Sequence, residues 1–208
     1  MTNIFLKAKH WQLFLLMVGV PLVSQIYIYA RIWLVESVPS TEMENNGFTQ
    51  VLDEKFIQFE WFPLVILGFG LLFFGWLWAL AIGLQKWVPV EAKMKTTRFK
   101  IFFFIPLVYF LFMVTSMSSL FSVDAESIFL NLGIIVAIIV PLHLFSMFCI
   151  LHTFYFAAKT LKTVELKRKV GFGDFIGEFF LLWFYFIGIW IIQPRVNRLH
   201  VQNNVTRK

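Results

Sequence analysis

The sequence predicts an all-α integral membrane protein with four transmembrane helices and a C-terminal interfacial or re-entrant helix. Three observations support this prediction. The 208 residues are 59% hydrophobic and only 14% charged, and their mean hydropathy is +0.76. A soluble domain carries roughly a quarter charged residues, and one of this size could not bury so much apolar side chain. Four long apolar segments alternate with polar connections, and the basic residues gather in alternate connections. We therefore treat residues 1–208 as a single membrane domain.

Four segments have the roughly 20 mostly apolar residues that one crossing of a bilayer requires. They cover residues 11–35, 61–85, 101–121 and 128–158. Tryptophans stand at both ends of the first two segments, namely Trp11, Trp33, Trp61 and Trp87. Because amphipathic rings favour the headgroup layer, these residues support the assigned ends.

The final apolar run, GEFFLLWFYFIGIWIIQPRVNRL, allows two interpretations. Its uninterrupted part, Phe179–Ile192, is shorter than a crossing requires. Extending it toward the N-terminus would carry Glu178 and Asp174 into the bilayer. We therefore expect one interfacial or re-entrant helix over about residues 174–193, and a full fifth crossing remains the alternative.

The basic residues predict the orientation of the chain. All of them except Arg31 and Lys55 lie before the first segment, between the second and third, or after the fourth. Because cytoplasmic connections carry an excess of lysine and arginine, both termini are predicted to be cytoplasmic. The net charge of +6 does not predict nucleic-acid binding, since the basic clusters are short and scattered. Membrane lipids are the expected partners of these charges.

Three polar residues are candidates for function. His143 stands near the middle of the fourth segment, where an ionisable residue suggests an ion or proton path. A hydrogen bond to a carbonyl freed by a nearby proline, or to a serine of the third segment, is the structural alternative. Asp174 and Glu178 could form a surface cation or proton site. Alternatively, Asp174 caps the last helix and both acids favour its dipole. Glu165 is expected to pair with Lys169 along one helix.

Small residues recur at every fourth position in two segments. The second segment contains Gly75, Ala79 and Gly83, and the fourth contains Gly133 and Ala137. Such spacing lets helices approach closely in lipid. The stripes predict close packing, either within this chain or against a helix of another protein.

No catalytic residue, metal or cofactor is predicted. The chain has a single cysteine, Cys149, and its histidines at 10, 152 and 200 match no zinc-ligand spacing. Nucleotide-binding, hydrolase and metalloprotease motifs do not occur in a credible setting.

The pattern GDFxGEFFLLWF…IGIWxxQPRxN, between Gly173 and Asn197, resembles the C-terminal signature of a family of small multi-pass membrane proteins from Bacteroidetes. The resemblance implies a location in the bacterial inner membrane. It implies no activity, and no site residue follows from it.

These observations favour a non-enzymatic accessory or structural subunit of a bacterial inner-membrane protein complex. Other membrane protein subunits are then the expected partners. One alternative is a small transporter or channel with a path near His143. Another is a membrane redox or lipid-modifying enzyme.

Overall fold

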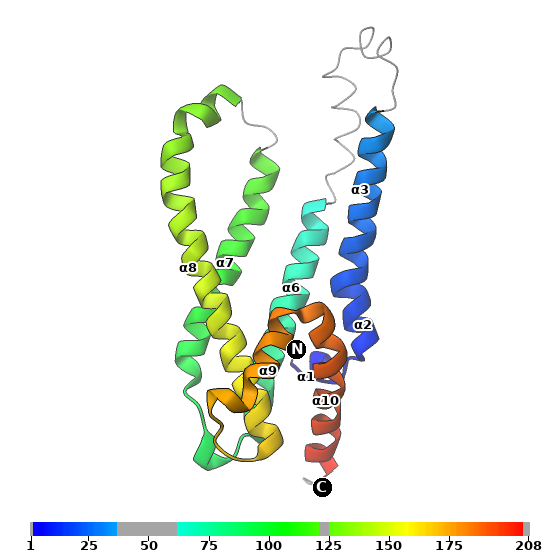
Figure 1. Ribbon diagram of the computed structural model, residues 1–208, viewed down its shortest axis with the longest axis vertical. Helices are drawn as coiled ribbons and strands as arrows, with labels where there is room; N and C mark the ends of the chain where they lie inside the picture. Colours follow the sequence, from blue (N-terminus) through cyan, green and yellow to red (C-terminus); the bar gives the residue numbers. More distant parts are fainter. Residues whose placement is uncertain (1, 37–61, 121–124, 206–208) are drawn as a thin grey trace.

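The computed structural model describes residues 2–36, 62–120 and 125–205, and every regular element in these ranges is a helix (Figure 1). This confirms the all-helical prediction. Four helical stretches are long and apolar enough to cross a membrane, as expected. They are His10–Ala30, Phe62–Trp87, Thr96–Ser116 and Val136–Leu166.

The first of these stretches is one continuous rod built from three helical elements. The short helix α1 (Thr2–Lys7) precedes it. The rod then runs through α2 (His10–Phe14), the π-helix η1 (Leu15–Gly19) and α3 (Val20–Glu36), and the capping residues between them keep helical angles. The π-helical turn ends two residues before Pro21, which has no N–H to donate to a regular helix.

The second, third and fourth stretches follow in an up-and-down order. Helix α6 (Phe62–Ala81) ends in two short 3₁₀ turns, η3 (Gly83–Trp87) and η4 (Val90–Ala92). Helix α7 (Thr96–Leu120) leads away and α8 (Ala125–Leu166) returns. Helix α8 has 42 residues and continues beyond residue 158, where the fourth predicted segment ends.

The C-terminal apolar run differs from the expected single helix. It forms two helices, α9 (Phe172–Trp183) and α10 (Tyr185–Val205), which are joined at Phe184. The backbone of Phe184 leaves the helical region, with φ −90° and ψ 59°. Figure 1 shows that the chain reverses there, so α9 and α10 form a hairpin at the end of the molecule that also carries both termini. A straight fifth helix through the bundle is thereby excluded.

The reversal depends on a close approach between the two arms of the hairpin. A Cβ atom added to Gly188 would lie 1.8 Å from the carbonyl oxygen of Leu181. Only glycine therefore fits at this position without moving the backbone. The close turn between α9 and α10 therefore requires glycine at position 188 of the apolar run.

Helix α8 ends before the next glycine in the sequence, Gly171. It stops at Leu166, and Lys167 adopts a left-handed conformation with φ 53°. Gly171 instead takes the N-cap position of α9. The expected pairing of Glu165 with Lys169 is replaced by contacts across helices, which are described below.

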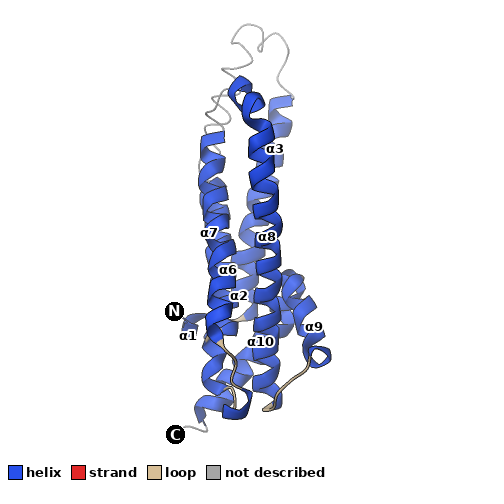
Figure 2. Cartoon of the chain, turned by 90° about the vertical axis from the view of Figure 1, so that its left-hand side faces the viewer, coloured by secondary structure: helices blue, strands red, loops and turns tan. Residues whose placement is uncertain are grey.

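The packed core lies in the half of the molecule that carries the termini, where α1, α9 and α10 lie against the longer helices (Figure 2). Its largest fully buried side chains come from nearly all the helices that meet there, and include Trp76 on α6, Phe99 on α7, Leu161 on α8, Phe175 on α9 and Ile192 on α10. Toward the opposite end, the α7–α8 pair lies apart from the α3–α6 pair (Figure 1). The fold therefore has a compact inner half, at the termini, and a more open outer half.

We expect Gly188→Ala to lower the free energy of unfolding by about 3 kcal/mol, because the new methyl group overlaps backbone that can move only with the whole hairpin. Thermal unfolding in detergent measures this loss. Gly177→Ala is the matched control, since nothing lies within 4 Å of its added Cβ. That variant should be stabilised by roughly 0.5–1 kcal/mol. Equal stability of the two variants would contradict the close turn.

Candidate functional site

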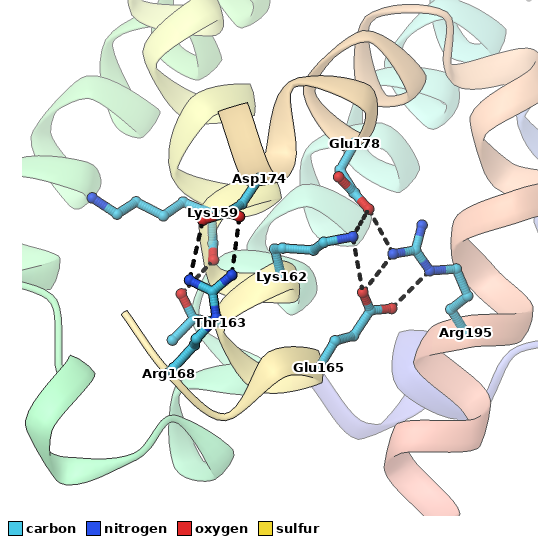
Figure 3. A network of polar contacts seen from close by, with 8 residues as sticks. All are labelled: Lys159, Lys162, Thr163, Glu165, Arg168, Asp174, Glu178 and Arg195. Atoms are coloured by element: carbon cyan, nitrogen blue, oxygen red, sulfur yellow. Dashed lines mark hydrogen bonds and ion pairs between the residues drawn. The ribbon is translucent and has the colours of Figure 1, made fainter. Parts of the chain in front are cut away.

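A cluster of ion pairs joins α8, α9 and α10 in the inner half (Figure 3). Arg195 on α10 binds Glu165 on α8 with two hydrogen bonds, of 2.7 Å from Nε and 2.5 Å from an Nη atom. The same Nη atom lies 2.6 Å from Oε1 of Glu178 on α9. One guanidinium therefore ties three helices together, with the bidentate geometry that favours arginine over lysine.

Lys162 completes the cluster. Its ammonium lies 2.9 Å from Oε1 of Glu178 and 3.8 Å from Oε2 of Glu165. The cluster thus holds two positive and two negative groups. Glu178 is its most buried member, with a side chain only 7% exposed. Since a buried charge is costly unless it is paired and hydrogen-bonded, the two cations are what permit a carboxylate at this position.

The surroundings keep both central charges ionised. Burial alone raises the pKa of Glu178, but hydrogen bonds from Arg195 and Lys162 outweigh burial and hold the pKa below its usual value. The hydrogen bonds to Glu165 raise the pKa of Arg195 despite its burial, and Glu178 adds to this effect. Glu178 is therefore a structural anion of this chain, and its oxygens already have partners within the chain.

Asp174 lies beside this cluster but belongs to a separate pair. Its Oδ2 accepts a hydrogen bond of 2.9 Å from the N–H of Gly171, and its Oδ1 lies 3.1 Å from Arg168. The bond from Gly171, followed by the one from Arg168, lowers the pKa of Asp174. The acid caps α9 as expected, although it does so from the third helical position rather than from the N-cap itself.

A second polar network fastens the N-terminus to α10. The buried Gln193 accepts a hydrogen bond of 2.9 Å from Nε1 of Trp76 on α6. Its amide nitrogen donates to the carbonyl oxygens of Phe5 and Ala8, at 2.7 and 2.8 Å. Asn197, one turn later, donates to the same Ala8 oxygen at 3.1 Å. These side chains satisfy carbonyls that the end of α1 leaves without intrahelical partners.

The small-residue stripe on α6 packs against α1 of the same chain. Added Cβ atoms would lie 2.7 Å from the ring of Phe5 at Gly75 and 3.3 Å from Leu6 at Gly83. Ala79, between them, is fully buried. On α8 the outcome is different, because Ala137 is exposed. Gly133 lies in the same helix, among residues whose surroundings the structure does not describe.

The structure places His143 against α7. Its Nδ1 lies 3.1 Å from the hydroxyl of Tyr109, and the two rings meet edge to face with centroids 5.7 Å apart. The partner is therefore a tyrosine, rather than the carbonyl or the serine considered from the sequence. His143 is otherwise exposed, in the part of α8 that lies outside the packed core.

The other histidines lie in separate places. His10 contacts Trp190, His152 lies against Phe102, and His200 meets Trp87. In the described part of the chain, no three side chains of histidine, cysteine, aspartate or glutamate are placed to hold a metal ion. Cys149 is buried.

Sequence reasoning overlooked Glu165, Gln193, Arg195 and Asn197 as partners in these networks. One signal was available. Gln193, Arg195 and Asn197 directly follow the apolar run, and polar groups at such a place need partners within the protein. The identity of those partners depends on the hairpin, because the two partners of Arg195 lie 17 and 30 residues away in the sequence.

Comparison of this chain with protein-family models, with curated proteins and with solved structures found no match.

We expect Arg195→Met to lower the free energy of unfolding by about 3 kcal/mol, because it keeps the aliphatic stem but leaves Glu165 and Glu178 short of positive charge. Arg198→Met, on an exposed position of the same helix, is the control and should change stability by less than about 0.5 kcal/mol. Thermal unfolding in detergent compares the two. Adding Glu178→Gln to Arg195→Met should recover part of the loss, and a further loss of similar size would speak against the cluster.

Proposed function

We propose that the protein is a non-enzymatic accessory or structural subunit of a protein complex in a bacterial inner membrane, with both termini in the cytoplasm. The observation that supports this proposal most is the exposure of the outer half of α8. Between residues 136 and 148, every residue except Ile139 and Ser146 is exposed, although His143 and Phe148 contact rings of α7. Most of the surface of this stretch of α8 is therefore not covered by the chain. Neighbouring helices of one chain bury much more of each other than this.

The distribution of small residues points in the same direction. The stripe on α6 is already covered by α1, whereas Ala137 on α8 is exposed. In lipid, helices associate where small side chains let their backbones approach. The outer half of α8 therefore offers a surface on which a helix from another subunit can pack.

The polar groups of the inner half support a structural role. The carboxylates of Glu165, Glu178 and Asp174 are all bonded to basic side chains of the same chain. The side-chain amide of Gln193 forms hydrogen bonds with Trp76 and with the end of α1. These contacts hold the helices in place and leave the inner half as a rigid base for the open outer half.

The orientation rests on the distribution of charge. The connections at the same end of the molecule as the termini hold the basic clusters around residues 7–9, 86–100 and 159–169 (Figure 1). Because the positive-inside bias is counted over short connections such as these, this end faces the cytoplasm in our proposal.

A photo-cross-linking residue, p-benzoylphenylalanine, should capture the partner when it replaces Phe145 or Phe148 in native membranes. Both phenylalanines are exposed on α8, at 48% and 57%. Phe180 is the matched control, because it is 50% exposed but lies on α9 in the inner half. We expect a discrete protein adduct from the α8 positions only. Adducts with lipid alone at Phe145 and Phe148 would count against a subunit role.

Single cysteines introduced in a Cys149→Ser background test the orientation. Lys93→Cys and Lys169→Cys should react with a membrane-impermeant maleimide only in inverted vesicles. Glu42→Cys, in the acidic connection after the first crossing, should react in intact spheroplasts. The reverse pattern would place both termini outside the cytoplasm.

A further inference from the structure

The contact between Tyr109 and His143 is a polar pair in the apolar outer half of the molecule. The hydroxyl of Tyr109 on α7 lies 3.1 Å from Nδ1 of His143 on α8. His143 is exposed, and Tyr109 is half-buried. Because both residues belong to stretches of spanning length, the atoms that they expose face lipid in a membrane, where no water satisfies a polar group.

The hydrogen bond within this pair leaves one donor and one acceptor unused. A neutral imidazole has one N–H and one bare nitrogen, and a tyrosine hydroxyl both donates and accepts. When the hydroxyl donates to Nδ1, the Nε2 atom of His143 carries the hydrogen and the oxygen of Tyr109 keeps a free lone pair. In the other tautomer Nε2 is the bare nitrogen, and the hydroxyl of Tyr109 keeps its hydrogen for another acceptor. Among the described residues, neither side chain has a second hydrogen-bond partner.

His143 also stands in a row of exposed residues at heptad spacing. The row is Val136, Val140, His143 and Met147, with intervals of four, three and four residues, and every member is exposed. Two helices that pack side by side in a left-handed coiled coil meet along such a row. A single polar residue in an otherwise apolar seam fixes the register of the two helices. The row therefore has the form of a seam for another helix, with His143 as its polar position.

A second copy of the chain carries the groups that the polar pair lacks. Two copies in one membrane have the same orientation, so a two-fold axis that relates them runs along the membrane normal. Equivalent residues of the two copies then lie at the same depth. Because Tyr109 and His143 are in contact, both lie near one depth already. The free donor of each copy is therefore level with the free acceptor of the other.

We propose that two copies of the chain associate along this seam, with Tyr109 and His143 of both copies in a closed ring of hydrogen bonds. Each chain contributes its internal contact, and Nε2 of His143 in each copy bonds to the Tyr109 hydroxyl of the other. The ring closes in either tautomer, because the unused donor and the unused acceptor only exchange places. A different protein would have to present a donor and an acceptor together at this depth, whereas a second copy does so by symmetry.

The self-association is separate from the contact that Phe145 and Phe148 probe. It shares with the proposed function only the placement of α8 in a membrane. At about 3.6 residues per turn, a residue two positions after His143 lies on nearly the opposite side of the helix. Phe145 therefore remains accessible to a helix of a different subunit while the seam is covered. Loss of the adduct at Phe145 would leave the self-association standing, and loss of the self-association would leave the subunit role standing.

Förster transfer between donor-labelled and acceptor-labelled full chains in liposomes, measured over a range of protein-to-lipid ratios, gives the dimerisation constant. Tyr109→Phe removes only the hydroxyl and His143→Phe replaces one ring by another. Each should weaken the wild-type dimer roughly tenfold, because interhelical hydrogen bonds in lipid are lost. Tyr29→Phe is the matched control, since it removes a hydroxyl from a tyrosine that is 64% exposed on α3, and it should associate as the wild type does. A monomeric wild type, or equal association of Tyr109→Phe and Tyr29→Phe, would overturn the proposal.

Cysteine cross-linking in native membranes tests the seam with the polar pair intact. In a Cys149→Ser background, Val140→Cys and Met147→Cys should form disulfide-linked dimers of the chain when a mild oxidant is added. Phe145→Cys, on the other side of α8, is the control and should stay monomeric. Absence of dimers at both seam positions, or equal linkage at Phe145→Cys, would show that the two copies do not meet along this row.

Discussion

The guanidinium of Arg195 connects three helices with directional bonds, in addition to the apolar core that they share. It bonds to Glu165 on α8 and to Glu178 on α9, while its own backbone belongs to α10. Between helices in lipid the hydrophobic effect supplies almost no attraction, so packing and directional polar contacts decide where a helix rests. Because a half-satisfied buried cluster is costly, the cluster favours the position of the α9–α10 hairpin in which all of these groups are paired.

The same helix α10 also holds the other end of the chain. Two residues before Arg195, Gln193 reaches the carbonyls at the end of α1 and the indole of Trp76. The aromatic and small-residue contacts of α1 with α6 then follow from this attachment. Two polar networks that share α10 therefore join the helices of the inner half, and they connect segments at opposite ends of the sequence.

Helix α9 carries apolar side chains on its exposed face as well as on its buried face. Its buried face carries Phe175, Leu182 and the charged Glu178, whereas Phe172, Phe180 and Trp183 are exposed. Such an arrangement suits an apolar surrounding. Helices of other subunits are proposed as partners for the exposed outer half of α8.

The sequence by itself determined the helical class and the presence of four apolar helices of spanning length, because bilayer thickness imposes a length and a composition that can be counted along the chain. It also singled out Glu178, Asp174 and the α6 stripe. Only the tertiary structure decided that the last run is a hairpin, since apolar residues are helical in either arrangement and a single glycine, Gly188, permits the turn. It alone decided that Glu178 pairs with Arg195, because such pairing depends on distances in space, whereas periodicity reports only the neighbours within one helix.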